Sequence, residues 1–126
     1  MQKFIIYGRL SGLNEYTLKC RGQFGQYGGN QLKKENENKV KKAIGQSNLK
    51  EVKKYPVKIE YKWIEENKKR DKDNIAFAHK FIQDSLVNMC ILENDTWKYI
   101  ECFSDEFDID KENPRIEVTI KEFGEY

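Results

Sequence analysis

Short apolar or alternating stretches predict four strands along the chain. Residues Lys3–Tyr7 form a compact apolar run, and apolar and charged side chains alternate through Tyr55–Ile64, which is the period of a half-buried strand. The segments Trp97–Phe103 and Arg115–Ile120 alternate in the same way. Because the acidic loop Ser104–Pro114 joins the last two segments, we expect them to pair as antiparallel neighbours.

Helical periodicity predicts two main helices. Gln31–Ile44 has a lysine-rich exposed face, with Asn30 suited to cap its start and Gly45 suited to end it. In the second helix, apolar residues recur at helical spacing through Ile75–Cys90, which makes it the longest amphipathic segment. Asp73 is suited to cap that helix, because aspartate accepts hydrogen bonds from the free backbone N–H groups of a helix start.

Glycine marks two further segments as loops. Gly8–Tyr16 is punctuated by glycine and asparagine, and Arg21–Gly29 is glycine-rich and too irregular for a regular element. Neither has the strand–loop–helix pattern of a phosphate-binding P-loop. The order of elements predicts one α+β domain, residues 1–126, whose small mixed or antiparallel sheet of about four strands carries the two main helices on one side.

Composition supports a folded domain and limits its chemistry. Charged residues make up 35% of the chain and the mean hydropathy is −0.87, but aromatic residues, at 13%, supply large apolar side chains that a disordered chain lacks. Cys20, Cys90 and Cys102, together with the single histidine His79, lack the spacing and number for a zinc site, so we expect reduced thiols. No apolar run is long enough for a signal peptide or a membrane span, which favours a cytoplasmic protein.

Charge is divided unevenly along the chain. Residues 1–72 contain 18 basic and 8 acidic side chains, whereas residues 84–126 contain 4 basic and 12 acidic ones, although the net charge of the whole chain is only +2. One interpretation is a basic face that binds a polyanion. The other is a pair of oppositely charged, solvated regions that attract each other, and the charge pattern alone does not choose between them.

Three aspartates carry the candidate chemistry. Asp71 and Asp73 stand two residues apart at the start of the second helix, and Asp95 lies in the turn after it. If Asp71 is still in extended backbone where the helix begins, both carboxylates can point the same way. Folding of the helix against its neighbours would then bring the third carboxylate to the same spot. A hard cation stabilises such a cluster, and Mg²⁺ is the usual one.

A lysine and a fourth carboxylate follow along the same predicted helix. Lys80 and Asp84 lie close to the direction of Asp73 at about 100° per residue, so the three form one polar stripe. A lysine near a metal site can stabilise the charge that develops on a phosphate during hydrolysis. The simpler interpretation is an exposed pair of side chains four residues apart, which contributes a few tenths of a kcal/mol.

This order of residues resembles the RusA family of Holliday junction resolvases. The matching segments are Arg70-Asp71-Lys72-Asp73-Asn74, then Lys80 through Asp84-Ser85-Leu86, then Asn94-Asp95. A weaker likeness extends over nearly the whole chain and includes the loop around Asn14 and the strand that starts at Pro56. The resemblance implies a Mg²⁺-dependent, structure-selective endodeoxyribonuclease of the prophage type. It would act as a homodimer on four-way junctions or other branched DNA, with no organic cofactor and no membrane.

The resemblance also implies roles for particular residues. Asp71, Asp73 and Asp95 match the metal-binding carboxylates, and Lys80 matches the essential lysine when it is counted back from Asp84. In the family that lysine usually follows the second aspartate by four residues, where this chain has Phe77, and Lys72 or Lys69 are the alternatives. The residues expected to contact the DNA backbone are Asn14, Arg21, Lys33, Lys34, Lys41, Lys42, Lys68, Lys69 and Arg70.

Four aromatic residues have more than one interpretation. Phe24 and Tyr27, in the glycine-rich segment, are suited to stack on unpaired bases at the centre of a junction. Trp63 and Trp97 are better suited to the hydrophobic core or to contacts between two copies of the chain. The sequence therefore places possible base contacts and core contacts in different segments.

Two other functions fit the same residues. One is a non-catalytic dimer that binds branched DNA and retains the resolvase fold, and Phe77 in the lysine position favours it. The other is a metal-dependent hydrolase of free nucleotides. Junction binding without strand cleavage would identify the first, and hydrolysis of nucleoside triphosphates would identify the second.

Overall fold

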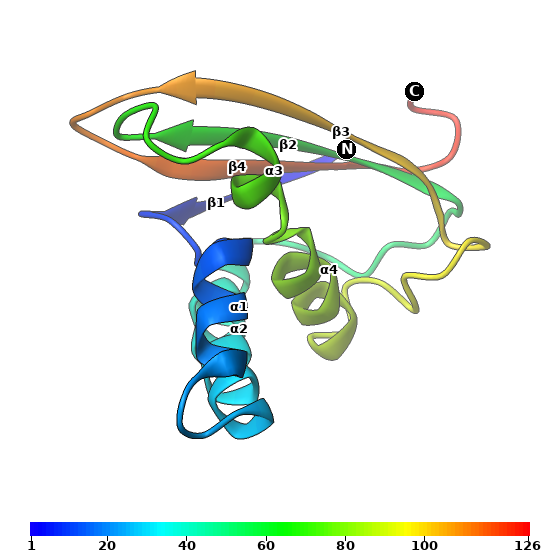
Figure 1. Cartoon of the computed structure of the whole chain (residues 1–126). Coiled ribbons are helices and arrows are strands. Elements are labelled where there is room, and N and C mark those ends of the chain that lie inside the picture. The colour runs from blue at the N-terminus through cyan, green and yellow to red at the C-terminus, as the bar shows by residue number, and fades with distance from the viewer.

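A four-stranded mixed sheet has helices α1, α2 and α4 on one side of it (Figure 1). The computed structural model describes all of residues 1–126. In chain order the elements are β1 (Gln2–Tyr7), α1 (Leu13–Arg21), α2 (Gln26–Gly45), β2 (Val57–Glu65), α3 (Lys72–Ala76), α4 (His79–Asn88), β3 (Ile100–Ile109) and β4 (Arg115–Lys121). The predicted α+β class is confirmed, as is the position of the helices on one side. None of the helices combines the length and apolar character needed to cross a membrane.

The strand order is β1-β4-β2-β3, with β4 antiparallel to both its neighbours and β2 parallel to β3. The parallel pair is possible because α3 and α4 form the crossover between β2 and β3. The expected antiparallel pairing of the last two strands is wrong, since β2 lies between them. The apolar residues Ile116, Val118 and Ile120 fit β4 for a central position under the helices, whereas the acidic side chains of β3 suit a solvated edge.

The core lies between the inner face of the sheet and the helices. In β2 the buried residues Ile59, Tyr61 and Trp63 alternate with half-exposed charged residues, as the sequence predicted. Their register partners on β4 are also buried, so one apolar layer runs across the central strands. The helices contribute the buried side chains of Leu32, Val40, Ile44, Phe81, Ile82 and Leu86.

The prediction of loops at Gly8–Tyr16 and Arg21–Gly29 is wrong in part. Helix α1 begins at Leu13, and α2 begins at Gln26, so most of both segments is helical or lies next to a helix. A Cβ atom on Gly28 would lie 2.8 Å from the carbonyl oxygen of Lys19, and one on Gly29 would lie 2.4 Å from the Sγ atom of Cys20. These glycines permit the close approach of two helices instead of breaking one.

The predicted long helix over Ile75–Cys90 is divided into α3 and α4. Around the break, the N–H groups of Ala78 and Lys80 bond carbonyl groups three residues back instead of four. Residues on both sides of the break, including Ile75 and Ile82, are buried, so the apolar pattern continues through it.

The strand predicted over Trp97–Phe103 begins later, at Ile100, and continues to Ile109 through part of the predicted acidic loop. Trp63 is in the core, whereas Trp97 precedes β3 and is 99% exposed, so of its two interpretations only a contact between copies of the chain remains.

The topology predicts a specific order of backbone protection. Amides of β4 and β2 should exchange with deuterium most slowly, because each of these strands has a neighbour on both sides. Amides of β1 and β3 that face away from the sheet should exchange much faster. Hydrogen exchange followed by NMR measures this order, and slower exchange in β3 than in β2 would contradict the strand order.

Candidate functional site

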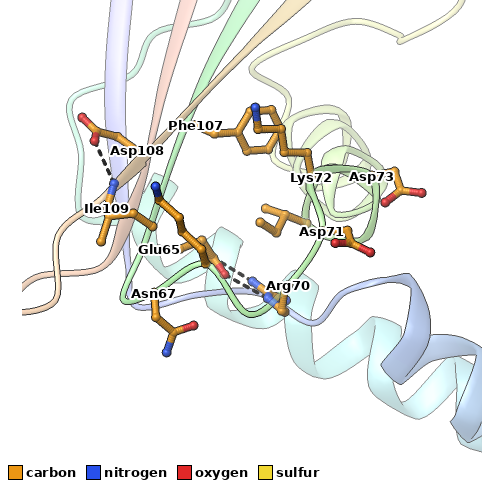
Figure 2. A pocket seen from close by; sticks show the side chains of 11 residues that line it. Glu65, Asn67, Arg70, Asp71, Lys72, Asp73, Phe107, Asp108 and Ile109 are labelled. Atoms are coloured by element: carbon orange, nitrogen blue, oxygen red, sulfur yellow. Dashed lines mark hydrogen bonds and ion pairs between the residues drawn. The ribbon is translucent and has the colours of Figure 1, made fainter.

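A buried ion pair fixes the loop that leads into α3. The guanidinium group of Arg70 donates from Nε to Oε1 of Glu65 at 2.9 Å and from Nη2 to Oε2 at 2.8 Å, while Nη1 donates to the carbonyl oxygen of Leu10 at 3.0 Å (Figure 2). Both side chains are largely buried. The two-pronged pair sets orientation as well as distance, so the end of β2 and the start of α3 keep one geometry.

A second contact fixes α3 against α1. The backbone N–H of Asn14 donates to Oδ1 of the buried Asn74 at 2.9 Å. Asn74 is packed so closely on Gly12 that a Cβ atom there would lie 2.5 Å from Oδ1 and 2.8 Å from the carbonyl oxygen of Asn74. Asn14, expected among the DNA contacts, thus has a structural role through its backbone.

Asp71 and Asp73 occupy the first turn of α3, between these two contacts. Asp71 is the N-cap residue in extended backbone, with φ −70° and ψ 154°, which corrects the prediction that Asp73 caps the helix. Asp73 lies inside the first turn, and its carboxylate accepts the N–H of Asn74 at 2.9 Å. Both carboxylates are exposed and lie on the same side of the turn, away from Lys72 (Figure 2). The expected extended approach of Asp71 is confirmed.

The two aspartates border a cleft of about 690 Å³ between the start of α3 and the end of β3. The ammonium group of Lys72 lies 5.5 Å from the centroid of the Phe107 ring, a cation–π contact across this cleft. The exposed side chains of Lys68 and Asp108 lie at its edge. The cleft therefore combines carboxylates with lysines, which is a suitable setting for a phosphate group and a cation.

The structure does not bring Asp95 to this cleft. Asp95 lies after α4 and lines a smaller pocket of about 230 Å³ with Lys33, Glu37 and Asp84. No three carboxylate, histidine or cysteine side chains are grouped so that they could hold a metal ion. The predicted convergence of three aspartates is thus wrong for the single chain, because Asp95 follows the far end of α4, and the length of that helix separates it from the start of α3.

Lys80 also lies outside the cleft. Its ammonium group is 3.4 Å from Asp84 on α4, the exposed pair that was the simpler interpretation of these two residues. Phe77, in the other candidate position for the lysine, packs on Tyr16 and Phe81 at ring-centroid distances of 5.3 and 5.6 Å. Lys72 is the lysine that the fold brings to the cleft from the alternatives considered.

Some of the predicted DNA-contacting residues are paired with carboxylates of the chain, and others are exposed to solvent. Arg70 is held by Glu65, and Lys33 is held by Asp84 at 3.2 Å and Glu37 at 3.7 Å. Burial opposes ionisation of Lys33, but the two carboxylates outweigh it and raise the pKa of its ammonium group. The basic residues that remain exposed are Arg21, Lys34, Lys42, Lys68 and Lys69, while Lys41 is half-buried.

The comparisons with known proteins do not identify a family. No protein-family model matches the sequence, and no curated protein is significantly similar to it. Function is therefore inferred from the residues themselves and from the geometry of the cleft.

Two carboxylates and a phosphate group are a sufficient ligand set for Mg²⁺. This ion usually keeps several waters and is held in proteins by one or two carboxylates together with phosphate oxygens of the substrate. Asp71 and Asp73 are exposed and share one side of a rigid turn, so they fit such a site, whereas a site made entirely by protein ligands does not fit. Any cation held here would depend on the substrate for part of its coordination.

A polar cluster that the sequence did not reveal lies under α4. Oδ1 of Asp105 on β3 accepts the Trp63 indole N–H at 2.7 Å and lies 2.6 Å from Nε2 of His79. Tyr61 packs against His79, and burial raises the pKa of its hydroxyl group well above the usual range. Only the pairing of β2 with β3 brings Asp105 to this point, and its position in a supposed acidic loop gave no signal.

We expect the Glu65–Arg70 pair to be a major contributor to stability. Arg70→Ala should reduce the free energy of unfolding by about 3 kcal/mol, because it leaves the buried Glu65 carboxylate without its partner. Arg115→Ala is the matched control, since Arg115 pairs with Asp110 and Glu117 near the surface and should cost much less. Urea unfolding measures both, and equal losses would contradict the structural role of Arg70.

The close contact at Gly12 gives a second stability prediction. Gly12→Ala should destabilise the protein by about 1–3 kcal/mol, because the added methyl group meets backbone as well as side-chain atoms of Asn74. Gly45→Ala is the control, since no atom lies within 4 Å of the position that its methyl group would take and alanine favours the helix. Thermal unfolding of the two variants tests this, and a harmless Gly12→Ala would mean that α3 is free to shift.

Proposed function

We propose that this protein is a divalent-metal-dependent endodeoxyribonuclease that hydrolyses phosphodiester bonds in branched DNA, with four-way junctions as the expected substrate. The observation that carries the proposal is the pair of exposed carboxylates, Asp71 and Asp73, at the start of α3. That turn is fixed on one side by the Glu65–Arg70 ion pair and on the other by the hydrogen bond between Asn14 and Asn74. The order of Asp71, Asp73, Lys80, Asp84 and Asp95 along the chain, which resembles the RusA resolvases, is in line with it.

The chain's own residues would act mainly by positioning and electrostatics. When bound, Mg²⁺ supplies neutralisation of phosphate charge and a more acidic nucleophilic water. Asp71 and Asp73 would attract the cation. The fixed backbone at the start of α3 would hold their two carboxylates in one position. Lys68 and Lys72 line the same cleft and would add positive potential near the phosphate, but the Lys72 side chain lies on the other side of the turn from the two carboxylates (Figure 2).

Recognition of DNA would come from exposed lysines and from symmetry. Lys68 and Lys69, in the loop that leads into the cleft, are placed to contact backbone phosphates without reading base sequence. A four-way junction has two opposed strands to cut, so we propose a twofold homodimer with one cleft for each strand. Branch selection then follows from the spacing of the clefts instead of from base contacts.

A second candidate function is non-catalytic binding of branched DNA. Two observations favour it: Asp95 lies in a different pocket from Asp71 and Asp73, and Phe77 is packed against Tyr16 and Phe81. A protein of this kind would keep the basic surface and the clamped loop but would not cut the strands. Cleavage and binding therefore have to be measured separately.

The aspartates distinguish the two functions. Asp71→Asn and Asp73→Asn should each abolish Mg²⁺-dependent cleavage of a labelled four-way junction. Each should leave junction binding intact or tighter, because repulsion between carboxylate and phosphate is relieved. Glu106→Gln, on the solvated face of β3, is the matched control and should cleave normally.

The results of this assay divide the possibilities clearly. Normal cleavage by Asp71→Asn or Asp73→Asn would disprove the metal assignment, and junction binding without cleavage by the unaltered protein would support the non-catalytic function. Asp95→Asn decides whether the third aspartate takes part. If the two-carboxylate site is complete, this variant should cleave at the normal rate.

The contribution of the loop lysines can be measured from the salt dependence of binding. Lys68→Ala combined with Lys69→Ala should weaken binding to any DNA sequence and should reduce the slope of log affinity against log salt by about 2. Lys98→Ala combined with Lys111→Ala is the control, because neither residue lies at the cleft. An unchanged slope in the Lys68 and Lys69 variant would remove this loop from the DNA contact.

A further inference from the structure

A groove on the opposite edge of the sheet carries features that the proposed nuclease does not use. It has a volume of about 560 Å³ and runs between residues 3–7 of β1 and the last turns of α2. Five consecutive strand residues line it, so it follows the main chain of β1 along its length. We call it the β1 groove, and its other wall consists of Lys39, Lys42 and Ala43 of α2 together with Gln46 and Ser47, which follow that helix.

The backbone of β1 faces this groove with free hydrogen-bonding groups. The N–H of Gly8 donates to the carbonyl oxygen of Pro114 at 2.9 Å, which continues the antiparallel register of β1 with β4 by one pair. In such a ladder every second residue bonds the partner strand. The N–H and C=O groups of Lys3, Ile5 and Tyr7 therefore point away from β4, and β1 has no other strand neighbour.

The side chains around the groove are basic and apolar. Lys39 and Lys42 are exposed and neither forms an ion pair with a carboxylate of the chain, and no acidic residue lines the groove. Lys3 pairs with Glu117 at 3.3 Å on the outer face of the sheet, beside Ile5 and Tyr7. Tyr7 is 69% exposed, which is unusual for a large aromatic residue in a strand.

We propose that the β1 groove binds an acidic, extended peptide segment of a partner protein, which adds to the sheet as a fifth strand. Such a segment would satisfy the free N–H and C=O groups of β1. Side chains that alternate along it would reach the lysines of α2 on one face and Ile5 and Tyr7 on the other. A partner with acidic and apolar residues in alternation fits both faces.

Two other occupants fit the groove less well. Nucleic acid would find the lysines and the N–H groups favourable, but the carbonyl oxygens of Lys3, Ile5 and Tyr7 would repel its phosphates. A second copy of β1 would bring Lys39 and Lys42 of one chain near the same lysines of the other. A peptide uses donors and acceptors together and meets the lysines with opposite charge.

The test uses a fluorescein-labelled peptide of about eight residues in which valine and glutamate alternate. Fluorescence anisotropy should show saturable binding to the full-length protein. A peptide of the same sequence with N-methyl groups on all its backbone nitrogens keeps the charge but has no N–H donor on either edge, and it should not bind. Amide signals of Lys3, Ile5 and Tyr7 should shift in NMR spectra when the unmodified peptide is added.

Protein variants separate charge from backbone pairing. Lys39→Glu combined with Lys42→Glu should weaken the affinity by about tenfold or more. Lys98→Glu combined with Lys111→Glu changes net charge equally outside the groove and should bind almost as the unaltered protein does. Ile5→Pro removes one outward N–H and no ladder bond, so it should weaken binding as well.

Each contrary result would overturn the proposal. Absence of peptide binding, equal binding of the N-methylated peptide, or equal loss in both charge variants would each exclude strand addition in this groove. Displacement of the peptide by duplex DNA that shifts the same three amides would assign the groove to nucleic acid. Concentration-dependent self-association that protects these amides would assign it to a second copy of the chain.

Discussion

The geometry of the candidate site depends on the buried pair between Glu65 and Arg70. Glu65 ends β2, which is a central strand and therefore one of the most firmly held parts of the sheet. Through Arg70 the pair transfers that rigidity to the loop before α3, and the bond to the Leu10 carbonyl ties the same loop to the segment after β1. The contact between Asn74 and Asn14 completes the restraint on the other side of Asp71 and Asp73. The two exposed carboxylates are thus positioned by side chains that are largely buried, namely the Glu65–Arg70 pair and Asn74. A binding site is more precise when buried contacts fix its charged groups in this way.

The same fold separates two kinds of surface. At the start of α3, carboxylates and lysines lie together at one cleft, and this mixture suits a phosphate group with a cation. Along the free edge of β1, lysines occur without carboxylates and next to unpaired backbone groups, and this combination suits an acidic peptide. The acidic strand β3 lies on the far edge of the sheet from β1, so the unequal charge of the two halves of the sequence becomes a difference between two edges. Basic and acidic regions do attract each other, as in the ion pair between Lys33 and Asp84. Other lysines, such as Lys39 and Lys42, have no carboxylate partner and stay exposed.

The sequence alone determined the class of most elements and much of the core, although it missed α1 and most of β3. Alternation identified β2 and β4, because a strand with one buried face requires period two, and the residues Ile59, Tyr61, Trp63, Val118 and Ile120 are buried as that pattern demands. The position of Asp71 in extended backbone just before a helix followed from local geometry in the same way. Such features depend on residues close in the chain, so a single sequence contains them.

Only the tertiary structure decided which distant residues meet. The chain order of β3 and β4 favoured a hairpin, but burial places β4 in the centre and β3 at an edge. Glycines 28 and 29 resemble loop residues until α1 is packed against them, and the break after Ala76 leaves no trace in an apolar pattern that both sides share. For the site, the aspartates themselves were visible in the sequence, but Asn74 and Lys72 acquire their roles through distant partners, Asn14 and Phe107. Glu65 and Arg70 are only five residues apart, but burial and the bond from Arg70 to the Leu10 carbonyl depend on the fold. Asp95 is separated from Asp71 and Asp73 because α4 lies between them in the chain and does not bring its far end back to the start of α3.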